Sequence, residues 1–80
     1  MDWHKYISSD PEVLVGKPVV QGTRLSVDFI LNLLAQGWKE EQILENYPTL
    51  TSESLQAVFA FAAECTRDGA FYVISPEVNL

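Results

Sequence analysis

The chain has 80 residues, of which 48% are hydrophobic, and this supports one compact domain with a core of modest size. Eleven acidic and five basic residues give a net charge of −6, so the long-range field repels nucleic acid and anionic lipid. The longest uninterrupted apolar run, residues 57–63, is too short to span a membrane, and no signal-peptide pattern is visible. The single cysteine excludes an internal disulfide, and we therefore expect a cytoplasmic protein that is not bound to a membrane.

Charge, glycine and proline divide this single domain (residues 1–80) into three parts. Residues 1–25 carry three acidic and three basic side chains together with half of the glycine and proline, which indicates short extended or β segments joined by turns. Residues 26–68 carry seven acidic and two basic side chains and have a helical pattern. Residues 69–80 form a tail. The sequence therefore predicts a mainly α fold with short N-terminal β segments.

The first 25 residues contain two β-branched clusters and two turn signals. Ser9-Asp10-Pro11-Glu12 predicts a turn, because Asp can bond its own backbone and Pro fixes φ. Val13-Leu14-Val15 and Pro18-Val19-Val20 predict short extended segments that need a neighbour to pair with. Gly22 is expected to supply a positive φ before the first helix.

The first helix is predicted to start after Ser26, a favourable N-cap, and to end before Gly37. Apolar residues recur at positions 27, 30, 31 and 34, and Phe29 and Leu33 widen the apolar sector beyond one face. A helix with so wide a sector is covered on more than one side. We therefore expect a homodimer whose interface contains Val19, Val20, Phe29 and Leu33.

Two more helices follow and complete a helix-turn-helix arrangement. The second is predicted over Glu40 to Asn46 and is ended by Pro48. The third is capped by Thr51 and runs to about Arg67. Its inner stripe is expected to contain Leu55, Val58, Phe59 and Ala62, and its outward face Glu53, Ala57, Ala60 and Glu64.

The predicted outward face of the third helix is a poor reader of DNA. Its two carboxylates would face phosphates, and Gln56 and Arg67 would lie at its margin. The nucleic-acid contacts that a dimer could offer are Lys17 and Arg24, in the N-terminal part. For Arg24 an ion pair with Asp28 or Asp10 is the favoured interpretation, and a contact with a partner or DNA is the alternative.

The tail begins with four consecutive apolar residues, Phe71-Tyr72-Val73-Ile74. It either packs back onto the domain or becomes ordered on a protein partner, since leaving such side chains in water costs roughly 1.5–3 kcal/mol each. Small and aromatic residues among acidic ones suit a protein partner better than a nucleic acid. The predicted partner-binding residues are therefore Phe61, Arg67, Phe71, Tyr72, Val73 and Ile74.

No motif for catalysis or cofactor binding stands out. Gly16-Lys17-Pro18 lacks the glycine spacing of a phosphate loop and has Pro where Ser or Thr is needed. One His and one Cys do not make a metal site. Glu64 and Asp68 near Cys65 would raise rather than lower the pKa of a thiol. We expect a non-enzymatic protein without cofactor or metal.

Four motifs that follow one another in order resemble a bacterial family, domain of unknown function 433. They are Ile7-Ser8-Ser9-Asp10-Pro11, Gly16-Lys17-Pro18-Val19-Val20-Gln21-Gly22-Thr23-Arg24, Gly37-Trp38 and Glu45-Asn46-Tyr47-Pro48-Thr49-Leu50-Thr51. The resemblance covers roughly residues 5–68. It implies a homeodomain-like three-helix fold preceded by β segments, usually dimeric.

The resemblance also implies a function. Members of this family are regarded as VapB-like antitoxins encoded beside a small PIN-like nuclease toxin. The expectation is thus an antitoxin-like protein of a toxin-antitoxin system that binds and neutralises such a nuclease and can regulate its own operator DNA. The alternative is a helix-turn-helix DNA-binding regulator without a toxin partner.

Overall fold

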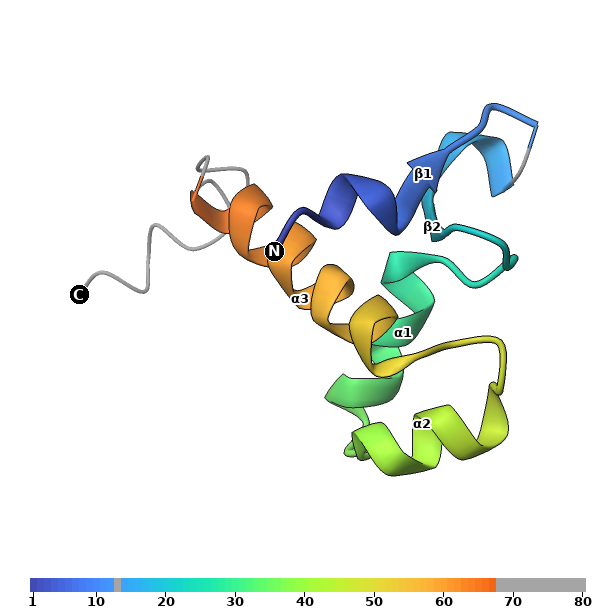
Figure 1. Cartoon of the computed structure of the whole chain (residues 1–80), viewed down its shortest axis with the longest axis vertical. Helices are drawn as coiled ribbons and strands as arrows, with labels where there is room; N and C mark the ends of the chain where they lie inside the picture. Colours follow the sequence, from blue (N-terminus) through green and yellow to red (C-terminus); the bar gives the residue numbers. More distant parts are fainter. Residues whose placement is uncertain (13, 68–80) are drawn as a thin grey trace.

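The structure is a computed structural model that describes residues 1–12 and 14–67 (Figure 1). Two short strands precede three helices, as expected, and two 3₁₀ turns lie among the strands. In chain order the elements are η1 (Trp3–Lys5), β1 (Ile7–Ser9), η2 (Leu14–Gly16), β2 (Pro18–Val20), α1 (Val27–Ala35), α2 (Glu40–Asn46) and α3 (Ser52–Arg67). The prediction of a mainly α fold with short N-terminal β segments is confirmed.

The two strands form an antiparallel hairpin next to the helices. Ile7 pairs with Val20 and Ser9 with Pro18, so the proline stands at the start of β2 where its missing N–H costs least. The turn after β1 is the predicted one, because the side chain of Asp10 accepts a hydrogen bond of 2.9 Å from the N–H of Glu12. A hairpin this small is stable only because it packs on helices.

The predicted extended segment at Val13-Leu14-Val15 is wrong where the structure describes it. Leu14 and Val15 belong to the tight turn η2, and Val15 has a φ of +56° with 94% of its surface exposed. The chain must reverse between β1 and β2, and it does so here in spite of the β preference of valine. Gly22, in contrast, has the predicted positive φ, +82°.

Helix α1 has the predicted signals at both ends. The hydroxyl of Ser26 accepts a hydrogen bond of 2.9 Å from the N–H of Phe29. At the other end Gly37 takes a φ of +96°, and its N–H donates to the carbonyl of Leu34 at 3.0 Å. The N–H of Trp38 donates to the carbonyl of Leu33 at 3.0 Å, which completes a Schellman motif.

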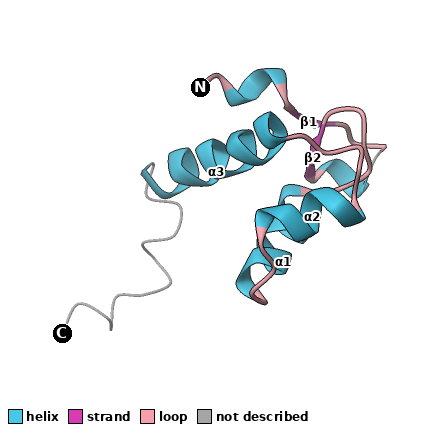
Figure 2. Ribbon diagram, turned by 60° about the horizontal axis from the view of Figure 1, so that its bottom comes forward, coloured by secondary structure: helices cyan, strands magenta, loops and turns pink. Residues whose placement is uncertain are grey.

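Helices α2 and α3 also begin and end near their predicted residues. The side chain of Gln42 accepts a hydrogen bond of 2.9 Å from the N–H of Lys39, which compensates for a lysine at the cap. Thr51 caps α3 by accepting from the N–H of Ser54 at 3.1 Å. In Figure 2, α3 begins near the hairpin and the α1–α2 pair and extends away from them.

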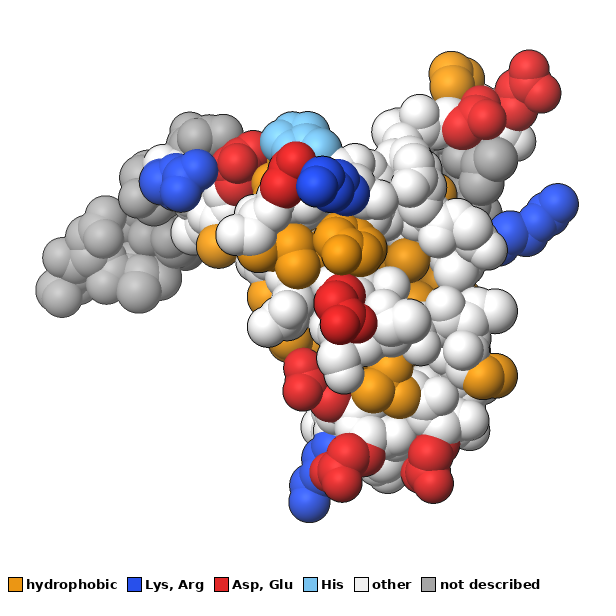
Figure 3. Space-filling view, viewed as in Figure 1, with side chains coloured by type: hydrophobic (Ala, Val, Ile, Leu, Met, Phe, Trp, Pro, Cys, Tyr) orange, Lys and Arg blue, Asp and Glu red, His pale blue; other side chains and the backbone are white. Residues whose placement is uncertain are grey.

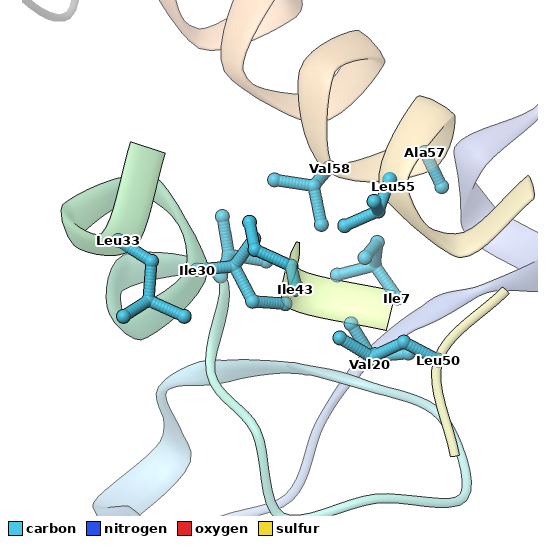
Figure 4. Packing of buried hydrophobic residues seen from close by; sticks show 10 residues of the cluster. Ile7, Val20, Ile30, Leu33, Ile43, Leu50, Leu55, Ala57 and Val58 are labelled. Atoms are coloured by element: carbon cyan, nitrogen blue, oxygen red, sulfur yellow. The ribbon is translucent and has the colours of Figure 1, made fainter. Parts of the chain in front are cut away.

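The core lies where the hairpin and all three helices meet (Figure 4). Ile30 from α1, Ile43 from α2 and Val58 from α3 are completely buried there, and Leu55 from α3 is nearly so. Ile7 and Val20 extend the core into the hairpin. Within the part of the chain that the structure describes, no helix combines the length and apolar character needed to cross a bilayer.

The predicted faces of α3 need correction. Ala57, expected outside, is completely buried, whereas Phe59, expected inside, is 44% exposed. The reason is the N-terminal segment, which runs beside α3 in Figure 1 and places Trp3 edge-to-face against Phe61 with ring centroids 4.8 Å apart. This contact covers a side of α3 that the helical pattern alone leaves open.

The burial expected from a second subunit is largely supplied by the single chain. Val19, Val20 and Leu33, which we had expected at a dimer interface, are each at most 7% exposed in the isolated subunit. Of the four predicted interface residues, Phe29 stays accessible, at 38% exposed. Packing inside the domain thus explains the contribution of Leu33 to the wide apolar sector of α1, and not that of Phe29.

Candidate interaction surface

The described part of the chain offers surfaces rather than cavities. Among residues 1–12 and 14–67 there is no pocket. Among these same residues there is also no group of three His, Cys, Asp or Glu side chains that could hold a metal ion. The features to consider are the loop before α1, the outward face of α3 and the N-terminal segment.

The loop that joins β2 to α1 is held by Thr23. Its hydroxyl donates to the carbonyl of Val20 at 2.8 Å and accepts from the N–H of Leu25 at 3.0 Å. The N–H of Val20 in turn donates to the carbonyl of Leu25 at 2.9 Å. This closed loop fixes the backbone of Arg24, whose side chain is exposed.

The two basic residues predicted to contact nucleic acid differ in their pairing. Lys17 lies 3.8 Å from the carboxylate of Asp28 in the first turn of α1. In the described residues no ion pair involves Arg24, and the carboxylate of Asp10 accepts from a backbone N–H instead. Neither of the ion pairs considered for Arg24 in the sequence analysis is present, so its guanidinium is available to a partner.

The outward face of α3 carries Phe59 at its middle. Gln56, Ala63, Thr66 and Arg67 are exposed along the same side of the helix. Arg67 makes an exposed contact of 3.5 Å with Glu64. Gln56 therefore belongs to this exposed face, whereas the sequence analysis had placed it at the margin of the outward face.

The N-terminal segment is tied to α3 through one aromatic side chain. The ring of Trp3 stacks on that of His4, with centroids 3.8 Å apart, while its edge-to-face contact fixes Phe61. Its indole N–H is buried and has no hydrogen-bond partner among the described residues. The side chain of His4 lies 2.9 Å from the carboxylate of Asp2, and this hydrogen bond holds the pKa of that carboxyl below its ordinary value of 3.8.

The structure places the predicted partner-binding residues in different settings. Phe61 is half-buried under Trp3 and offers less surface than expected, and Arg67 ends α3 in an exposed position. The other four, Phe71, Tyr72, Val73 and Ile74, lie outside the described residues.

Sequence reasoning missed Phe59 and Thr23. Phe59 was assigned inward from helical spacing. The role of Thr23 could have been predicted from the Gly22-Thr23 pair, because a Thr hydroxyl in a turn commonly forms hydrogen bonds with the nearby backbone.

The surface is acidic with small apolar areas. In Figure 3, acidic side chains and a basic one lie at the end of the molecule formed by α2, and some hydrophobic side chains adjoin one another across the middle of this face while others lie apart. Phe29 contributes a further exposed ring at the α1–α2 side, edge-to-face with Tyr47 at 5.6 Å. These features suit contact with protein better than contact with phosphate.

Comparison with known proteins points to one family. Residues 7–62 match the sequence profile described as "Protein of unknown function (DUF433)". The crystal structure of a DUF433 member from Anabaena variabilis superimposes with a TM-score of 0.72 at 29% identity, covering 78% of this chain and 61% of that one.

A relative with a similar sequence is also uncharacterized. The uncharacterized protein y4eO of Sinorhizobium fredii is 36% identical over 56 residues, which is 70% of this chain. The chain spans about a quarter of the length of that relative, since the match covers 25% of it.

Proposed function

Since the chain belongs to the DUF433 family, we propose that it is a non-enzymatic, antitoxin-like protein that binds and neutralises a PIN-like nuclease. The observation that carries this proposal is the exposed Arg24 on a backbone fixed by Thr23, in a domain whose accessible surface combines acidic side chains with exposed aromatic rings. A surface of this composition is typical of protein recognition.

The hypothesised mechanism is occlusion of the nuclease site. PIN-like nucleases use clustered carboxylates to hold a divalent metal. An arginine side chain satisfies such carboxylates with two parallel hydrogen bonds and competes with the metal. Arg24 is better suited to this role than Arg67, because Glu64 already lies 3.5 Å from Arg67.

Co-expression with the neighbouring open reading frame tests the proposal. We expect the two proteins to co-purify and the neighbour to be toxic when it is expressed alone. Arg24→Ala should weaken rescue of growth, whereas Lys39→Ala, which removes another exposed cation at the cap of α2, should not. If no complex forms and the neighbour is harmless, the antitoxin proposal fails.

A DNA-binding regulator is the second candidate, and the position of Gln56 favours it. Gln56 lies on the outward face of α3, the second helix of a helix-turn-helix, and glutamine can bond adenine in the major groove. The test is a gel-shift titration with the upstream DNA at low and moderate salt. Retardation that Gln56→Ala abolishes would support this function; no retardation at either salt concentration would exclude it.

A further inference from the structure

The outward face of α3 forms a continuous line along the helix. Gln56, Phe59, Ala63 and Thr66 are spaced three, four and three residues apart, which places them on one side of an α-helix. All four are exposed, and Phe59 is 44% exposed. We call these four residues the α3 seam. It borders the buried Leu55 and lies on a different side of α3 from the core residues Ala57 and Val58.

The seam combines one large side chain with one small side chain in adjacent positions. Phe59 and Ala63 are one helical turn apart, and Ala63 leaves room for a ring from a facing helix. If a second α3 lies antiparallel on the seam, with the symmetry axis near residues 60–61, Phe59 of each copy meets Ala63 of the other. The two contacts are identical by symmetry.

The charges beside the seam fit the same arrangement. Glu53 and Arg67 lie on the same flank of the seam, one near each end of α3, and are separated by about 21 Å along the helix axis. Both are exposed, and although Arg67 lies 3.5 Å from Glu64 of its own helix, its side chain is 73% exposed and can reach a second carboxylate. In an antiparallel pair Glu53 of each copy is opposite Arg67 of the other, whereas a parallel pair would place like charges together.

We infer that the α3 seam is the contact surface for a second copy of this chain, with the two α3 helices antiparallel. Phe59 fills the space above the partner's Ala63, and two Glu53–Arg67 pairs close the ends of the contact. This inference goes beyond the proposed function and does not depend on a toxin. It also covers Gln56 and Arg67, so the same face is not free to read DNA while the dimer persists.

The experiment measures the mass of the full chain across the micromolar range by light scattering and sedimentation. We expect a concentration-dependent dimer that Phe59→Ser abolishes. Phe29→Ser is the matched control, since Phe29 is a similarly exposed phenylalanine on α1 and should leave the dimer intact. Far-UV circular dichroism should show native helix content for both variants.

Charge exchange gives an independent test of orientation. Glu53→Arg or Arg67→Glu alone should weaken the dimer about tenfold, because the symmetry axis repeats each repulsion, and the double variant should restore it. Glu45→Arg makes the same change of charge on exposed α2 and should have no effect.

The inference is overturned by a wild-type chain that remains monomeric across this range. It is also overturned by a dimer that survives Phe59→Ser or is lost in Phe29→Ser, and by single charge reversals that the double variant does not rescue. A failure of toxin binding leaves these results unchanged, so the two proposals are tested separately.

Discussion

At the scale of single residues, the least favourable backbone conformation in the described structure belongs to Val15. A β-branched side chain at a φ of +56° costs roughly 1–2 kcal/mol relative to a right-handed conformation, and the exposed side chain gains little from packing. The neighbouring Gly16 also has a positive φ, +82°, as expected in a turn that reverses the chain.

Val15→Gly should therefore stabilise the domain by about 0.5–1 kcal/mol, because the strain removed exceeds the entropy that glycine adds to the unfolded chain. Urea denaturation followed by circular dichroism measures this. Val15→Ala is the control: alanine has the same difficulty with positive φ and should give a smaller gain. A loss of stability in Val15→Gly would contradict the conformation of this turn.

A second residue-scale feature is the carboxyl of Asp2, whose pKa is lowered mainly by the hydrogen bond from the His4 side chain and then by that from the His4 N–H. A lowered pKa in the folded state stabilises the fold at pH values above 3.8, and this contribution is lost as the pH falls through the folded pKa.

We expect an NMR titration of Asp2 to show a midpoint below 3.8 in the wild-type chain. In His4→Ala the midpoint should move back part of the way, because the backbone N–H of residue 4 remains. An unchanged midpoint in this variant would show that the His4 side chain does not contact Asp2 in solution.

At the scale of elements, the end of each helix depends on one or two specific contacts. Helix α1 stops where Gly37 adopts a φ of +96° and Trp38 turns back to bond Leu33. A Cβ at position 37 would have no atom of the described structure within 4 Å, so the demand for glycine there arises from the backbone and not from crowding.

Gly37→Ala should destabilise the domain by about 1 kcal/mol, and Gly37→Asn by less, because asparagine tolerates the left-handed region better. Thermal unfolding of the two variants checks the order. Equal stability of Gly37→Ala and the wild type would mean that α1 ends differently in solution.

At the scale of the whole molecule, the hairpin and the three helices share one small core, so they are expected to unfold together. Ile30 of α1 and Ile43 of α2 are completely buried in this core and connect the two helices. Helix α2 has only seven residues. A helix this short has little stability of its own in water.

Ile43→Ala should cost about 2–5 kcal/mol and leave a large fraction of the chain unfolded, since small domains have little stability to spare. Leu44→Ala on the same helix, where the side chain is half-buried, should cost less. Denaturant titration measures both, and a coincident transition by fluorescence and circular dichroism is expected.

The sequence predicted the boundaries of the helices well because they depend on local chemistry. Ser26, Gly37, Pro48 and Thr51 act within a few residues of themselves, and each ends or caps a helix as expected. The orientation of α3 could not be predicted in this way. Its residues 57–63 are apolar around the whole circumference, and the face that becomes buried is chosen by Trp3, about 58 residues before Phe61 in the chain.

The same limit applies to the candidate site. The exposure of Arg24 followed from its place in a turn, but its freedom from an ion pair depends on Asp28 having Lys17 as its neighbour. Likewise, Val20 and Leu33 looked available to a second subunit, but both are buried in the core that the hairpin and the three helices share. Long-range contacts decided each of these points.

The contact between Trp3 and Phe61 makes the amino terminus a structural component of the domain. One of the two tryptophans of the chain therefore reports by its fluorescence on whether this terminus is docked. A tag or fusion joined directly before Met1 would sit beside this contact, so an affinity handle placed there risks detaching the terminus and exposing the flank of α3 that it protects.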